Sequence, residues 1–240
     1  MVFATVSPHT VNVKNTRTTQ MKSKTLLIAA AVLTAGVISS QAQVYSQNVV
    51  GYANVVLVGG YNLVANPFDD GNGNQLTNLI NPSLLPAKSS VTTWNTGLQA
   101  YNAPLTGGGG SWNANTTLTP GVGFFVKNGT VASPTVTNTF VGNVIVPVSA
   151  SGTNGLVNNY TLVGSQIPYA TANLFTDTNV NLVGSGLAGK SSVTAWSPAL
   201  QAYNAPVTFG TATPTALAVG QGIFIKSVQG PTNWVQTLNP

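Results

Sequence analysis

One phrase occurs twice in this chain, and it constrains the possible fold more than any other feature. Residues 88–106 read KSSVTTWNTGLQAYNAPLT and residues 190–208 read KSSVTAWSPALQAYNAPVT, with fourteen of nineteen positions identical. Three of the five differences fall at 95–97 and 197–199, where two strands of a hairpin would turn. The repeated phrase therefore predicts a β-hairpin that is present in two copies of one structural unit.

Three further pairs of segments match between the two halves of the chain. They are 50–51 (VG) with 141–142 (VG), 61–64 (YNLV) with 160–163 (YTLV), and 121–127 (GVGFFVK) with 220–226 (GQGIFIK). The separation between partners varies, which indicates that strands are kept while loops differ in length. We expect two β units of about 100 residues each, at 43–138 and 139–240, which is an ordinary domain size.

Within each unit, runs rich in Val, Thr, Phe, Tyr and Trp alternate with clusters of Gly, Asn and Pro. This spacing is typical of an antiparallel sandwich or barrel, and 25 glycines and 14 prolines disfavour long helices. Only residues 74–80 carry a helical period, of one or two turns. The fold class is predicted as all-β, with two tandem homologous antiparallel units. Strands are expected at 48–58, 61–67, 89–95, 98–104, 121–127, 136–146, 160–166, 191–197, 200–206, 220–227 and 233–238.

The beginning of the chain has the layout of an export signal. Two lysines precede the apolar run 26–38, and small residues follow up to Ala42. A basic flank, a short apolar core and a small-residue step define a secretory signal peptide, and the run is shorter than a membrane helix requires. We expect a signal peptide at 21–42, preceded at 1–20 by an over-extended start or a disordered leader. The mature protein would then be periplasmic, at the cell surface or extracellular.

The expected mature chain, 43–240, is nearly neutral and poor in reactive side chains. It has four lysines and three aspartates, a net charge of +1, and no His, Cys, Glu or Arg. Ser-His-Asp and Cys-His sites cannot form, zinc lacks its usual ligands, and no basic cluster attracts nucleic acid. We therefore expect a protein that is not an enzyme, has no cofactor, binds no nucleic acid and has no membrane span once mature. The sequence indicates no oligomeric state.

Residues 184–191 (GSGLAGKS) match the phosphate-binding pattern G-x-x-x-x-G-K-[ST]. That loop requires a helix to begin at the lysine, so that its N-terminus faces the anion. Here β-branched and aromatic residues follow at 191–197, and a proline ends the run. We interpret the match as a glycine-rich turn before a strand.

A second motif has the alternating spacing of a calcium loop. Asp70, Asn72 and Asn74 make it a candidate metal site, although Gln75 and Asn81 stand where an EF-hand has Gly and Glu. The second half contains no counterpart. The alternative interpretation is a plain Asn/Gly turn.

Three segments carry a resemblance to known sequences. They are 45–52 (YSQNVVGY), 62–67 (NLVANP) and 118–126 (LTPGVGFFV). With the Trp-bearing hairpin, they resemble a group of uncharacterised exported bacterial β-repeat proteins that carry N-V-V-G-Y, L-I-A-N-P and L-x-P-G-x-G-F-F-V segments. The resemblance implies export and β architecture and transfers no site residues. The second half departs from the pattern at 164–166 (GSQ) and 218–220 (AVG).

The repeated hairpin is matched on both faces of its strands, so core packing of one face does not explain the match. Either both faces are buried, or the duplication is recent and unevenly eroded, or the hairpins form twin surfaces for a neutral polysaccharide. Aromatic planes stack on sugar rings, and amides bond to sugar hydroxyls. The candidate ligand-binding residues are Trp94, Gln99, Tyr101, Asn102, Trp196, Gln201, Tyr203 and Asn204.

The lysines of the mature chain are also equivalent between the units, Lys88 with Lys190 and Lys127 with Lys226. We interpret them as solvated charges that discourage edge-to-edge pairing of strands. The function expected first is an exported, non-catalytic surface, matrix or adhesion-type structural protein. The alternative is a carbohydrate-binding module. The partners expected are neutral polysaccharide or other cell-surface proteins.

Overall fold

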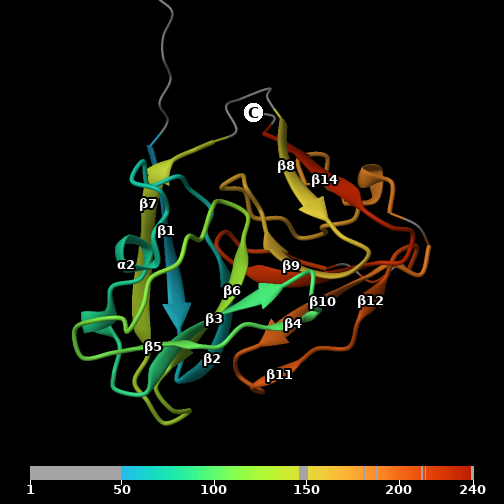
Figure 1. Cartoon of the computed structure of the whole chain (residues 1–240). Helices are drawn as coiled ribbons and strands as arrows, with labels where there is room; N and C mark the ends of the chain where they lie inside the picture. Colours follow the sequence, from blue (N-terminus) through green and yellow to red (C-terminus); the bar gives the residue numbers. More distant parts are fainter. Residues whose placement is uncertain are drawn as a thin grey trace, which may run out of the picture. The chain divides into compact units, whose positions relative to one another are not determined.

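Strands dominate the part of the chain that the computed structural model describes (Figure 1). It describes residues 50–238 apart from 146–150, 181, 188, 212 and 214. All of these residues, which include both β repeats, pack together as one compact body. The leader and signal peptide expected at 1–42 lie outside the described residues.

The first half contains two antiparallel sheets. In one of them β1 (Val50–Leu57) pairs with β7 (Val136–Asn143). The other has the order β2-β6-β3-β4, and β5 also pairs with β3. Its strands are β2 (Gly60–Ala65), β3 (Ser89–Asn95), β4 (Ala100–Tyr101), β5 (Leu105–Gly107) and β6 (Gly123–Asn128). The helical turns α2 (Leu76–Leu79) and η2 (Pro82–Leu84) connect β2 to β3.

The second half repeats this arrangement. β8 (Ser151–Leu156) pairs with β14 (Thr232–Thr237), and the central sheet has the order β9-β13-β10-β11, with β12 also paired to β10. Its strands are β9 (Asn159–Gly164), β10 (Ser192–Ser197), β11 (Ala202–Tyr203), β12 (Val207–Thr208) and β13 (Gly222–Ser227), and η3 is Val183–Ser185. The all-β class with two tandem antiparallel units is thus confirmed.

Each half has its own sandwich-like core, because strands alternate apolar and polar side chains. In the first half Val64 and Phe124 of the central sheet pack with Leu57 and Phe140 of the β1–β7 pair. In the second half Trp234 of β14 is fully buried in a separate cluster with Leu156, Val163 and Ile223, and its Nε1 donates to the carbonyl of Val180. Each core therefore holds one small sheet against one central sheet.

The boundary between the halves lies later than the sequence predicts. β7 runs through position 139 and pairs with β1 along its whole length, so it belongs to the first half. The equivalence of 50–51 with 141–142 is wrong, because Gly51 and Gly142 are partners across β1 and β7. The first strand of the second half is instead β8, whose sequence SGTNGL predicts a turn because Gly and Asn are depleted in strands.

Two other expectations have clear outcomes. The helical period at 74–80 corresponds to α2, and the strand expected at 98–104 shrinks to the two residues of β4. No helix begins at Lys190, where the described chain turns and then enters β10, so the interpretation as a turn before a strand is confirmed. Within the described residues, no helix has the length and apolar character needed to cross a membrane.

Candidate functional site

One face of each central sheet carries two rows of side chains that are the same in both halves. Its first row, in strand register, is Tyr61, Lys127, Ser90 and Thr106, matched by Tyr160, Lys226, Ser192 and Thr208. Its second row is Leu63, Phe125 and Thr92, matched by Leu162, Phe224 and Thr194. All seven positions of these two rows, called the docking face below, are identical. The next row on the same face is Ala65 with Gly123, matched by Gly164 with Gly222.

The opposite faces of the same strands, which line the cores, differ at several positions, although Val64 with Val163 and Val91 with Val193 are unchanged. The exchanged pairs are Phe124 with Ile223, Val126 with Ile225, Thr93 with Ala195 and Leu105 with Val207. Cores tolerate apolar exchanges of this kind when the total volume is kept. The identity of the docking faces therefore has a cause other than packing within each half.

Part of that cause is that the two docking faces pack against each other. Leu63, Phe125, Leu162 and Phe224 form one buried cluster, with Trp94 and Trp196 packed against it. Each tryptophan meets the phenylalanine of the other half edge to face, with ring centroids 5.0 Å apart for Trp94 and Phe224. The Nε1 of Trp94 donates to the Tyr160 carbonyl at 3.1 Å. Both tryptophans are half-buried and join the halves.

Trp196 makes the reciprocal contacts. Its ring meets Phe125 at 5.1 Å, and its Nε1 donates to the carbonyl of Tyr61 at 2.8 Å. A contact in which residue i meets j and j meets i is what a twofold relation produces in a symmetric dimer. The two halves of this chain are therefore docked as the subunits of such a dimer would be.

The repeated hairpin also supplies Gln99 and Gln201, which hydrogen-bond to the other half. Both residues have a left-handed backbone, with φ of 50° and 51°. Gln99 accepts from the backbone N–H of Tyr160 at 2.9 Å and donates to its carbonyl at 3.0 Å. Gln201 makes the same pair of bonds with Tyr61, at 2.6 and 3.1 Å. Each glutamine thus completes the backbone bonding at the beginning of the other half's central sheet.

We predict that Gln99→Ala lowers the free energy of unfolding by about 1 to 2 kcal/mol, because two backbone groups of Tyr160 lose their partner. Alanine at position 99 still has to adopt the unfavourable left-handed φ. The loss of stability therefore measures the contribution of the glutamine side chain alone. Gln99→Gly is the matched control, since it removes the same side chain but relieves the left-handed backbone, and it should be less destabilising. Urea unfolding measures both. A Gln99→Ala variant as stable as the parent would contradict this role.

Tyr101 and Tyr203 meet where the two hairpins approach each other. Their hydroxyl groups share a hydrogen bond, and each ring packs edge to face on both Phe125 and Phe224. Burial raises the pKa of both phenols, although the hydrogen bond from Tyr203 partly offsets the effect on the pKa of Tyr101. Both phenols therefore stay neutral at physiological pH, and both side chains remain partly exposed.

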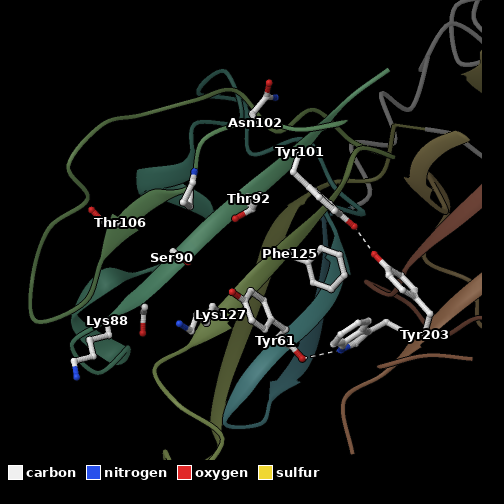
Figure 2. A pocket seen from close by; sticks show the side chains of 13 residues that line it. Tyr61, Lys88, Ser90, Thr92, Tyr101, Asn102, Thr106, Phe125, Lys127 and Tyr203 are labelled. Carbon is white, nitrogen blue, oxygen red and sulfur yellow. Dashed lines mark hydrogen bonds between the residues drawn. The ribbon is translucent and has the colours of Figure 1, made fainter. Parts of the chain in front are cut away.

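Beside this tyrosine pair lies a groove of about 660 Å³ (Figure 2). Aromatic side chains from both halves line one part of it, and Lys88 and Lys127 lie on the side away from Tyr203. The Nζ of Lys127 lies 5.5 Å from the ring centre of Tyr61. None of the three aspartates lines the groove. The lining residues are Tyr61, Lys88, Ser89, Ser90, Thr92, Tyr101, Asn102, Pro104, Thr106, Phe125, Lys127, Trp196 and Tyr203.

The eight ligand-binding candidates from the sequence separate into two groups. Tyr101, Asn102, Trp196 and Tyr203 line the groove, and Asn204 is the exposed equivalent of Asn102. Trp94, Gln99 and Gln201 join the halves, and Trp196 does both. The sequence did not indicate Tyr61, Ser90, Thr92 or Thr106 as site residues, although the match of 61–64 with 160–163 was a usable signal for Tyr61.

The interpretation of the lysines as edge charges is wrong for Lys127 and Lys226. Lys127 lies on β6, between β2 and β3, and Lys226 lies on β13, between β9 and β10. Neither strand is an edge of its sheet, so these charges do not prevent edge pairing. Their place on the docking face, beside a tyrosine and a serine, requires another explanation.

The calcium candidate forms a hydrogen-bonded turn. Asp70 accepts from the backbone N–H of Asn72 and Asn74, and the Asn74 side-chain oxygen accepts from Asp70 N and Asn66 Nδ2. Burial raises the pKa of Asp70, but the bonds from Asn74, Asn72 and the Asn78 side chain outweigh it, and the pKa lies below its usual value. The described residues contain no group of three or more His, Cys, Asp or Glu placed to hold a metal ion.

The fold and the groove together define an all-β protein whose two halves dock reciprocally and leave an aromatic and cationic groove beside the contact. Comparisons of the chain with protein-family models, curated proteins and solved structures found no match. The chemistry of the groove itself therefore carries the functional interpretation.

Proposed function

We propose that this protein is an exported, non-catalytic surface or matrix protein of the adhesion type, and that its groove binds a polysaccharide. One observation carries the proposal: tyrosine and tryptophan rings share the groove with hydroxyl, amide and ammonium groups. The C–H faces of sugar rings stack on aromatic side chains, and sugar hydroxyls need donors and acceptors beside them. The volume of about 660 Å³ is that of an ordinary ligand site.

Binding without cleavage is what this groove supports. Hydrolysis of a glycosidic bond usually needs two carboxyl groups on either side of the bond. The groove is lined by no aspartate, and the chain contains no glutamate or cysteine. Burial raises the pKa of Tyr101 and Tyr203, so these two groove residues do not act as bases near neutral pH. Export is part of the proposal and rests on the signal-like segment 21–42.

A purely structural role without a ligand is the second candidate. The observation that favours it is the use of Trp94, Trp196, Gln99 and Gln201 to join the halves. This docking accounts for much of the identity between the repeated hairpins. It does not account for Lys127 and Thr106, which line the groove and take part in none of these contacts between the halves.

The two candidates are separated by a binding experiment on the mature chain, residues 43–240. We expect affinity electrophoresis in gels that contain soluble polysaccharides to retard the protein, and Tyr61→Ala to weaken the binding about tenfold, which corresponds to about 1.4 kcal/mol. Tyr52→Ala is the matched control, because Tyr52 is 75% exposed on β1 and is not a lining residue. It should leave the binding unchanged. Thermal melts show whether each variant is folded.

If the parent protein binds no polysaccharide, the structural role stands alone. If Tyr61→Ala and Tyr52→Ala weaken binding equally, the ligand binds at a surface other than the groove.

A further inference from the structure

The positive charges of the described chain lie at two equivalent places. Residues 43–240 have four cationic side chains, Lys88 and Lys127 in the first half and Lys190 and Lys226 in the second. Lys88 is the repeat equivalent of Lys190, and Lys127 is that of Lys226. Lys127 and Lys226 hold the same position in the row of each docking face, and each Nζ lies over a tyrosine ring, at 5.5 and 5.4 Å. The chain has few charges, and its lysines occupy equivalent positions at the central sheet of each half. This placement indicates that the lysines have a function.

The backbone at Lys88 and Lys190 supports the same conclusion. Their φ angles are 69° and 78°, in the left-handed region that costs free energy for a residue with a side chain. Of the residues that the structure describes, six other than glycine have such angles: Asn74, Lys88, Gln99, Asn159, Lys190 and Gln201. Asparagine tolerates this region, and the two glutamines use their side chains to join the halves. The lysines remain, and strain of this kind persists where a side chain has a function.

These lysines are free to bind an anion. Lys88 and Lys190 are exposed, and Lys127 and Lys226 are half-buried. The three aspartates lie at positions 69, 70 and 177, and none of them lines the groove. Hydroxyl groups of Ser90 and Thr106 lie in the same row as Lys127. The groove therefore offers ammonium and hydroxyl donors next to aromatic rings.

We infer that the protein has two equivalent grooves and that each binds a segment of an acidic polysaccharide. The inference rests on the proposed function and specifies its ligand. Sugar carboxylates would bind at the lysine pair, while the sugar rings lie against the tyrosines. The second groove is assigned by repeat equivalence to Tyr160, Lys190, Lys226, Thr194 and Asn204, with Trp94 and Tyr101 from the first half. The shared pair of Tyr101 and Tyr203 lies between the two grooves.

The test is calorimetric titration of the mature chain with a polyuronate oligosaccharide and with the same oligosaccharide after methyl esterification. Esterification removes the negative charge and leaves the sugar rings. We expect two equivalent sites for the acid form and at least tenfold weaker binding of the ester. Binding of the acid form should weaken as salt is raised, because exposed charges are screened. A sulfated polysaccharide, tested in parallel, shows whether the lysines prefer carboxylate to sulfate.

Two variants locate the sites. Lys127→Gln should leave one strong site, in the second groove, and Lys226→Gln should leave one in the first. The control is Lys127→Gln combined with Val131→Lys, which restores the net charge at a residue that is 72% exposed and is not a lining residue. It should not restore the site that Lys127→Gln removes from the first groove. Lys88→Gly should weaken binding at one site while leaving the melting temperature unchanged or raised, because glycine accepts the left-handed backbone.

The outcomes separate this inference from the proposed function. Equal binding of acid and ester, or of a neutral polysaccharide, overturns the acidic ligand and leaves polysaccharide binding standing. A preference for the sulfated polymer over the polyuronate overturns the assignment to carboxylates. If the parent protein has only one binding site, or if Val131→Lys restores the site lost in Lys127→Gln, the inference of two equivalent grooves is wrong. Binding of no polysaccharide overturns both proposals. A lower melting temperature for Lys88→Gly would show that the lysine stabilises the fold, and it would overturn the argument that its left-handed backbone serves ligand binding.

Discussion

Replacing Trp94 or Trp196 with alanine is expected to lower the free energy of unfolding by about 3 kcal/mol, and by nearly the same amount at both positions. Truncating a buried tryptophan costs about 3 to 5 kcal/mol, and the lower end applies because both rings are half-buried. Each change removes an edge-to-face contact with a phenylalanine of the other half and a hydrogen bond to a tyrosine carbonyl. Urea unfolding followed by circular dichroism measures the loss.

Leu98→Ala in the first hairpin is the matched control. Leu98 is 76% exposed, so its truncation should change the free energy of unfolding by less than about 0.5 kcal/mol. A loss confined to Trp94→Ala, with Trp196→Ala unchanged, would contradict the reciprocal docking of the two halves. Full stability of both variants, with loss of ligand binding, would identify the tryptophans as ligand contacts alone.

Gly222→Ala is expected to destabilise the protein by about 2 to 3 kcal/mol, through overpacking where the halves meet. A methyl group on Gly222 would lie 2.7 Å from the Val64 carbonyl oxygen, and one on Gly123 would lie 2.9 Å from Leu162 Cγ and 3.0 Å from the backbone nitrogen of Val163. Two reciprocal backbone hydrogen bonds join the halves nearby, from Ala65 N to Gly220 O and from Gly164 N to Gly121 O. Thermal and urea unfolding measure the loss.

The control for this prediction is Gly155→Ala in β8. A methyl group there meets no atom within 4 Å, so the substitution should be neutral or slightly stabilising. Gly123→Ala should behave like Gly222→Ala but with a smaller loss, because its nearest contact is a side-chain atom that can move. An unchanged melting temperature for Gly222→Ala would show that the halves are not as closely docked as described.

Much of the architecture was predictable because the repeated phrase is long. Two β units, the hairpin and most strands followed from it and from the spacing of turn residues. β8 was not predictable from SGTNGL, since its pairing with β14 comes from tertiary context that overrides the low strand propensity of Gly and Asn. The two-residue match of 50–51 with 141–142 was too short to distinguish repeat partners from strand partners.

The candidate site was predictable in part. The aromatic and amide residues of the phrase do converge, because one hairpin places them together in each half. The sequence could not predict which of these residues join the two halves and which line the groove, because this depends on how the two halves meet. The row of Tyr61, Lys127 and Ser90 required the order of β2, β6 and β3, in which residues far apart in sequence become neighbours.

The burial of Phe125 against the second half has a consequence for the order of folding. The first half can form its own core early, but its docking face stays uncovered until β9 and β13 have been made. Contacts between residues so far apart along the chain slow folding, and apolar surface that is transiently exposed promotes association between chains. The last folding step should therefore be the closure of the two halves, and the period before it is when the newly made chain is most prone to aggregate.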